Sequence, residues 1–323
     1  MSARRPRDAA SKLLGAVALG LSSAETIEIA RRGAPQAPSV AASPGPTGAK
    51  GMLQASAALL AASVLIDSAI EHYRGSFKNP GMYVPLLSST LALLSGAEGA
   101  ARSARAWRPV RRSSYKMAVA VGAVGTAFHL YDISRRPGGF GWLNLFYGAP
   151  LGAPPALTVS GLLGLCAEEL QNAPDGSAKL KGFSAGRVIA ALNAVALAGT
   201  VAEVALLHFR GAFQNPFMWA PVTLPPVASG LMAKAAVERP ARRYPLTRIW
   251  LWVTTALGFV GMGFHAYGVS RAMGGWRNWS QNLLDGPPLP APPSFSALAI
   301  ASLSAVDLLQ EEAREADLKD KAA

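Results

Sequence analysis

Charged residues and cysteine are both scarce in this chain of 323 residues. Only 15% of the residues are charged and 50% are hydrophobic, whereas a typical soluble domain carries about 25% charged residues. Cys166 is the single cysteine, which excludes an internal disulfide, a Cys-x-x-Cys redox pair and a thiolate metal cluster. The sequence has no Walker loop and no His-Glu-x-x-His, so nucleotide chemistry of the P-loop type and zinc-dependent hydrolysis are not expected.

The hydrophobic residues gather in blocks of about 20, the length that crosses a bilayer core of ~30 Å. This pattern predicts an all-α integral membrane protein. Eight spanning helices are predicted, at residues 52–72, 81–100, 116–134, 152–171, 187–208, 217–236, 246–270 and 291–309. Another apolar stretch, 10–30, ends in Glu25 and Glu28. It is interpreted as an N-terminal apolar helix that spans the membrane or lies on it, with a signal peptide as the alternative.

Basic residues account for the net charge of +12, and they concentrate in short loops between the apolar blocks. That distribution is typical of a topology signal and not of a nucleic-acid surface, so the lipid bilayer is the expected surroundings and no nucleic-acid partner is expected. The richest loops are 101–116, 171–187 and 234–248. The positive-inside rule places them in the cytoplasm, which puts the opposite loops on the periplasmic side of a bacterial inner membrane.

The four histidines lie in two motifs that each occur twice. His72 and His129 are 57 residues apart, as are His208 and His265, and the second pair is the first shifted by 136. The segment His-Tyr-Arg-Gly-Ser-Phe-Lys-Asn-Pro at 72–80 returns as His-Phe-Arg-Gly-Ala-Phe-Gln-Asn-Pro at 208–216. Phe-His-Leu-Tyr-Asp-Ile-Ser-Arg at 128–135 returns as Phe-His-Ala-Tyr-Gly-Val-Ser-Arg at 264–271.

This repetition indicates an internal duplication. The predicted architecture is two tandem, parallel four-helix transmembrane bundles, preceded by the N-terminal apolar helix. The boundaries are 1–51 for that helix and a Pro/Ala/Ser-rich linker, 52–175 for repeat 1, 187–309 for repeat 2, and 310–323 for an acidic tail. Four helices per repeat is an even number, so both histidine pairs are predicted at one membrane face.

The histidines are the candidate ligands of a cofactor. We expect the first helix to continue to about Lys78, because Pro80 disfavours helical geometry at the residue before it. The third should end near Arg136 at a Gly-Gly pair. His72 and His129 would then face each other at similar depth on diagonal helices of a bundle, where two imidazoles can ligate a b-type haem axially. His208 and His265 would hold a second haem in the same way.

Other duplicated polar residues complete the predicted site. Asp67 and Glu203 each precede a histidine by five residues, which turns the carboxyl about 140° from the ring on a helix and favours a proton path over iron ligation. A carboxylate bonded within its own helix is the alternative. Four arginines could pair with haem propionates or a quinone head group, or extend to the membrane interface; these are Arg74, Arg210, Arg135 and Arg271.

In architecture the chain resembles the NrfD-type membrane subunits of respiratory oxidoreductases, and its paired histidines resemble four-helix cytochrome b anchors. The resemblance covers residues 52–309 and rests on no shared motif. It implies a subunit of a membrane complex that docks a periplasmic redox protein, and that is either non-catalytic or quinone-reactive. Three functions are therefore open: a haem b subunit exchanging electrons between that partner and quinone, a haem-free NrfD-like quinone-binding subunit, and a structural or assembly subunit in which the histidines only hold helices together.

Overall fold

The computed structural model describes residues 48–170 and 179–322; the predicted N-terminal segment 10–30 lies outside them. Long helices occupy all eight segments in which a span was expected: α3 Ala49–Arg74, α4 Val84–Ala101, α5 Arg108–Arg135, α7 Ala153–Leu170, α8 Ala185–Arg210, α9 Ala220–Val237, α10 Pro245–Arg271 and α12 Pro293–Ala322. Short elements connect them: η1 Pro80–Tyr83, η2 Arg105–Trp107, α6 Trp142–Tyr147, β1 Lys179–Leu180, β2 Phe183–Ser184, η3 Pro216–Trp219, η4 Gly275–Asn278 and α11 Trp279–Asp285.

In the described ranges 48–170 and 179–322, five helical segments are long and apolar enough to cross a membrane: Ala49–Arg74, Arg105–Arg135, Ala185–Arg210, Pro245–Arg271 and Pro293–Ala322. Helices α4, α7 and α9 have 18 residues each, which corresponds to about 27 Å at 1.5 Å per residue. The described part of the chain is thus mostly helical, and five of the eight predicted spans lie in helices that meet the length and apolar composition of a membrane-crossing helix.

Large apolar side chains lie on the outside of these helices and small polar ones lie between them. Leu87, Phe128 and Val195 are 61%, 67% and 73% exposed, whereas Ser88 and Ser302 are fully buried. A water-soluble protein rarely presents large contiguous apolar patches. In a bilayer, by contrast, helices associate through small residues and hydrogen-bonding side chains because lipid is as apolar as leucine. This distribution therefore fits a lipid surrounding.

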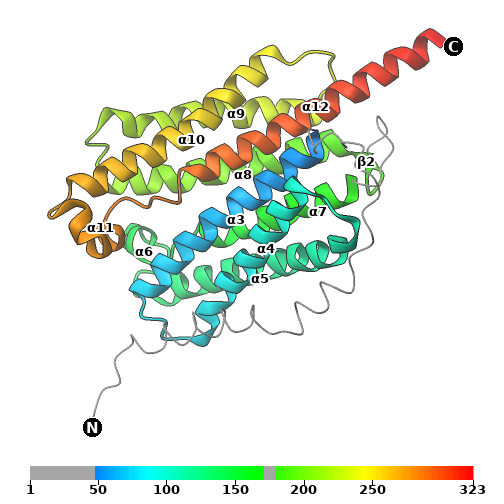
Figure 1. Ribbon diagram of the computed structural model, residues 1–323. Helices are drawn as coiled ribbons and strands as arrows, with labels where there is room; N and C mark the ends of the chain where they lie inside the picture. Colours follow the sequence, from blue (N-terminus) through cyan, green and yellow to red (C-terminus); the bar gives the residue numbers. More distant parts are fainter. Residues whose placement is uncertain (1–47, 171–178, 323) are drawn as a thin grey trace. The chain divides into compact units, whose positions relative to one another are not determined.

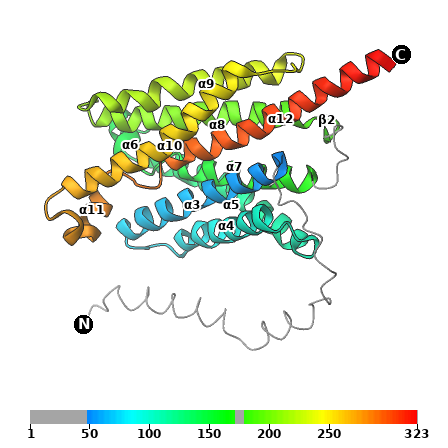
Figure 2. The same cartoon turned by 45° about the horizontal axis from the view of Figure 1, so that its top comes forward.

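Each long helix has two principal neighbours within its half of the sequence. Helix α3 packs against α4 and α7, and α5 packs against the same two helices. In the second half, α8 packs against α9 and α12, as does α10. Helix α12 also packs along α3, joining the two halves, and both ribbon views show it between α3 and α10 (Figures 1 and 2).

The four histidine-bearing helices, α3, α5, α8 and α10, end on the same side of the helical assembly. Helix α6, which follows α5, contacts α8, and α11, which follows α10, contacts α3. The hairpin of β1 and β2 lies at the opposite end of the helices (Figure 1). Both histidine pairs are thus at one end of the helices.

Helix α3 ends at Arg74, so the expectation that it continues to about Lys78 is wrong. Gly75 is the residue that caps the helix, and the two residues after it turn left-handed, with φ of 59° at Ser76 and 45° at Phe77. Helix α8 ends in the same way, with φ of 54° at Ala212 and 46° at Phe213. His72 therefore lies only two residues before the end of its helix.

Candidate functional site: four carbonyl-bonded histidines

The side chains of His72 and His208 are each hydrogen-bonded to the turn that follows their own helix. The Nδ1 of His72 donates to the carbonyl of Met82 at 2.6 Å, and the Nδ1 of His208 donates to the carbonyl of Met218 at 2.8 Å. Met82 and Met218 lie in η1 and η3, directly before the next long helix. Each histidine therefore holds the connection between two adjacent helices.

The other repeated residues of this motif shape the same turn. The side chain of Asn79 accepts a hydrogen bond from the backbone N–H of Gly81, and that of Asn215 accepts one from Phe217. An added Cβ at Gly75 would lie 2.9 Å from the terminal methyl group of Met82, so a larger residue there would require the flexible Met82 side chain to shift. The repetition of the motif thus reflects a shared backbone structure as well as shared histidines.

Stacked aromatic rings flank both histidines of this first motif. Phe77 meets the His72 ring edge-on, with centroids 6.2 Å apart, and stacks on Tyr83. Phe213 has the same relation to His208 and stacks on Trp219. The left-handed conformation at the two phenylalanines brings these rings back over the helix end.

His129 and His265 are bonded to the segment that leads into the fourth helix of each repeat. The Nδ1 of His129 donates to the carbonyl of Pro150, and the Nδ1 of His265 donates to that of Pro288 at 2.7 Å. Asn144 and Asn282 hold the same connections by donating from their side-chain amides to backbone carbonyls. All four histidines are half-buried.

A carbonyl oxygen accepts a hydrogen bond and cannot donate one, so each Nδ1 carries a hydrogen. In the neutral ring, the lone pair then lies on Nε2, the atom that commonly binds metals. A ring N–H bonded to a backbone carbonyl is also the usual arrangement behind a metal-bound histidine. Within residues 48–170 and 179–322, no hydrogen bond engages any of the four Nε2 atoms.

The two histidines of each half lie within electrostatic range of each other. His72 interacts with His129, and His265 interacts with His208. Among the residues that the structure describes, no three His, Cys, Asp or Glu side chains converge on a metal position. A metal at either pair would therefore need a centre that takes two protein ligands, and haem iron is such a centre.

The four arginines predicted beside the site differ in their contacts. Arg74 forms an ion pair with Glu71 at 2.9 Å. Arg210 donates to the carbonyl of Phe146 at 2.8 Å and lies over the Tyr147 ring. Arg135 and Arg271 end α5 and α10 and are exposed. Arg210 thus helps to join the two halves of the chain, a contact that the sequence did not indicate.

The acids Asp67 and Glu203 lie close to each other, although they come from α3 and α8. The Oε1 of Glu203 accepts a hydrogen bond from the backbone N–H of Gly152 at 2.8 Å, immediately before α7. A carboxylate is favourable at a helix N-terminus because the unpaired N–H groups there carry partial positive charge. The two acids therefore lie at the junction between the halves, and Glu203 also supports the start of α7.

Substituting Gly152 by alanine should destabilise the protein by about 1–3 kcal/mol, the usual penalty of losing a buried hydrogen-bond partner or overpacking a site. An added Cβ would lie 1.3 Å from Oε2 of Glu203, so the carboxylate must move away from the N–H. The check is the thermal midpoint of the purified protein in detergent. Gly199→Ala on α8 is the control, because nothing lies within 4 Å of its added Cβ; equal effects of the two changes would refute the packing argument.

A buried network of charged residues at the opposite end of repeat 1 was not predicted. Arg111 is 1% exposed and lies between Glu168 and Glu98, with 2.5 Å from its nitrogens to each carboxylate. Gln54 donates to Glu168 at 2.7 Å and accepts from the hydroxyl of Tyr115. Sequence reasoning assigned Arg111 only to a basic cytoplasmic loop.

The same positions in repeat 2 hold a different set of side chains. Arg111, Tyr115 and Glu168 correspond to Thr247, Leu251 and Val306, all of them buried. The neighbouring, half-exposed pair is retained, because Arg112–Glu169 in repeat 1 corresponds to Arg248–Asp307 in repeat 2. The repeats therefore share the histidine end and differ in the core of the other end.

Comparison with protein families, with curated proteins and with solved structures returns no match for this chain.

Proposed function

We propose that the protein is an integral membrane electron-transfer subunit, built as two tandem four-helix bundles by internal duplication. Each bundle would hold one haem b, through His72 and His129 in the first and His208 and His265 in the second. Electrons would pass between a periplasmic redox protein and quinone in a larger membrane complex. Bound haem would supply a one-electron carrier, while the chain would position it and keep water away.

The observation that supports this proposal is the state of the four imidazoles. Each is oriented by a backbone carbonyl at Nδ1 and leaves Nε2 without a hydrogen bond in the described part of the chain. The rings occur as two pairs within electrostatic range. Ionisable groups inside a bilayer are costly and usually functional, and two oriented imidazoles form a ligand set that suits haem iron.

The common end of the two pairs determines the direction of the proposed electron transfer. Two haems at one membrane face cannot form a ladder across a core of ~30 Å. Electrons would therefore move laterally, between the periplasmic partner and a quinone bound at similar depth. Asp67 and Glu203, which lie within electrostatic range of each other, are the groups we assign to proton exchange with that quinone.

A structural or assembly subunit is the second candidate, and the local hydrogen bonds favour it. His72, Asn79 and Gly75 fold one turn, and their counterparts in repeat 2 fold the same turn. If this is the function, each histidine acts only through the hydrogen bond that its Nδ1 donates to a backbone carbonyl. A haem-free quinone-binding subunit of the NrfD type differs from both in needing Asp67 and Glu203 but no iron.

The proposed function is tested by adding a short-chain quinol to the oxidised, purified protein and following haem reduction by stopped-flow absorbance. We expect reduction of the haem bands, and about 100-fold slower reduction in the double variant Asp67→Asn/Glu203→Gln, the low end of the effect of losing acid–base groups. The glutamine can still accept from Gly152, so haem content should not change. Unchanged kinetics in the double variant would exclude a proton role for these acids.

A further inference from the structure

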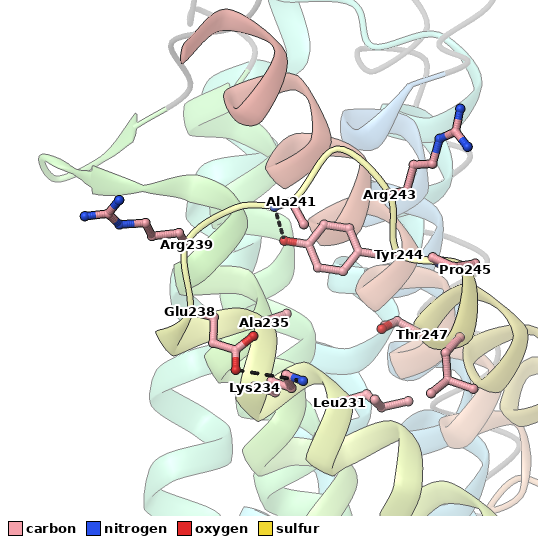
Figure 3. A pocket seen from close by; sticks show the side chains of 11 residues that line it. Leu231, Lys234, Ala235, Glu238, Arg239, Ala241, Arg243, Tyr244, Pro245 and Thr247 are labelled. Atoms are coloured by element: carbon pink, nitrogen blue, oxygen red, sulfur yellow. Dashed lines mark hydrogen bonds and ion pairs between the residues drawn. The ribbon is translucent and has the colours of Figure 1, made fainter. Parts of the chain in front are cut away.

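A pocket of about 250 Å³ lies at the loop between α9 and α10, at the end of the helices remote from the histidines. Its lining includes Lys234, Arg239, Arg243, Tyr244 and Thr247. Figure 3 shows the Tyr244 ring beneath the loop, with its hydroxyl accepting a hydrogen bond from the backbone N–H of Ala241, and the two arginines extending outward on either side. The pocket therefore lies between three separate cationic side chains, of which the two arginines extend away from it.

The corresponding place in repeat 1 is filled by the buried ionic network. Lys234 and Thr247 take the positions of Glu98 and Arg111. In repeat 1 the Arg111 guanidinium bonds to the Glu98 carboxylate and to the carbonyl of Ala104. In repeat 2 a short hydroxyl side chain replaces the arginine, and the carboxylate is replaced by an ammonium group. Repeat 2 therefore lacks the side chain that fills this space in repeat 1, and the charge at the edge of the space is positive instead of negative.

Little negative charge balances the cationic side chains that line the pocket. Glu238 is the one acid in its lining, and it lies 3.8 Å from Lys234 in a pair whose side chains are more than half exposed. In the described ranges Arg239 and Arg243 form no ion pair. Helix α10 begins at Pro245 with no side chain capping its first N–H groups, and such N–H groups favour an anion.

Apolar side chains stand directly beside the cationic ones. Val237, which precedes the loop, is 78% exposed, and Leu246 in the pocket wall is 57% exposed. Trp252, further along α10, is 60% exposed. Basic residues above exposed apolar and aromatic side chains are typical of the membrane interface, and basic pockets between helices on the cytoplasmic side recognise lipid head groups.

We propose that this pocket binds a phosphate group at the membrane surface. Lys234, Arg239 and Arg243 neutralise its charge, and the N–H groups of the first turn of α10 after Pro245 donate hydrogen bonds to it in the space that Arg111 fills in repeat 1. The same chemistry is offered by the head group of an anionic phospholipid and by free phosphate. The site is separate from the histidine pairs and does not depend on the electron-transfer proposal.

The experiment uses the full chain, delipidated in neutral detergent, and measures thermal stabilisation on titration with three probes. These are phosphatidylglycerol and phosphatidylcholine in mixed micelles, and inorganic phosphate. A ligand that binds the folded state raises the midpoint in proportion to its affinity. Stabilisation by phosphatidylglycerol alone identifies a lipid head group, and saturable stabilisation by inorganic phosphate identifies a soluble source. Absence of stabilisation by both overturns the proposal.

Two variants localise the binding. Arg239→Ala/Arg243→Ala removes two exposed side chains and should weaken binding roughly 25-fold, at about fivefold for each basic residue near a membrane surface. Lys234→Glu/Thr247→Arg copies the repeat 1 pair into the pocket and should abolish binding. Arg105→Glu, an exposed charge reversal in the corresponding loop of repeat 1, is the control. Binding that survives the arginine double variant at full strength also overturns the proposal.

Discussion

Replacing Arg111 by threonine should lower the free energy of unfolding by about 3 kcal/mol, the lower end of the range for breaking a buried ion pair. The change leaves the Glu168 carboxylate, which is fully buried, without its nearest partner. Arg108 remains 3.6 Å from Glu168, which is why we expect the lower end. The measurement is the midpoint of chemical or thermal unfolding in detergent.

Repeat 2 supplies the compensating substitution. Adding Glu168→Val to Arg111→Thr copies the pair Thr247 and Val306, so the double variant should be more stable than Arg111→Thr alone. The neighbouring change Arg112→Thr is the control, because its pair with Glu169 is exposed and such pairs contribute about 0–1 kcal/mol. Equal losses for Arg111→Thr and Arg112→Thr, or additive losses in the double variant, would contradict a buried network.

Substituting His72 by asparagine should remove one of two haems and leave the other. The asparagine amide can take the place of Nδ1–H and donate to the carbonyl of Met82, but it offers nothing in place of Nε2. His129→Asn should remove the same haem, because both proposed ligands come from one bundle. The measurement is haem content per chain, together with the thermal midpoint of each variant.

The matching changes in repeat 2, His208→Asn and His265→Asn, should remove the second haem alone. Loss of both haems from a single substitution would mean that ligands are shared between the bundles. If asparagine preserves stability and the absorbance spectrum at all four positions, the histidines act only through Nδ1. The structural function would then replace the electron-transfer function.

The positions of the helices could be predicted from the sequence because apolar block length and loop charge act locally. The proximity of His72 to His129 could also be predicted, since helices one and three of a four-helix repeat run in the same direction. The end of α3 was placed four residues late. Gly75 is an ordinary helix-ending signal, but the left-handed turns at Ser76 and Phe77 carry none, because neither residue type favours that conformation.

The buried network could not be predicted because its members look unremarkable in sequence. Arg111 stands in a loop rich in arginine, and Glu168 stands beside Glu169 near a helix end, where a charge is usually solvated. Only the packing of α5 against α7 makes one arginine buried and its neighbour Arg112 exposed. The carbonyl partners of the histidines were missed for the same reason, since backbone acceptors leave no trace in residue identity.

Haem content is the measurement that tests the central claim most directly. The purified full chain is examined by reduced-minus-oxidised absorbance and by conversion of its haem to the pyridine complex, with protein determined in parallel. The account predicts an α band of b-type haem and two haems per chain, one for each histidine pair. A preparation from haem-replete cells that folds stably and shows no α band would contradict it.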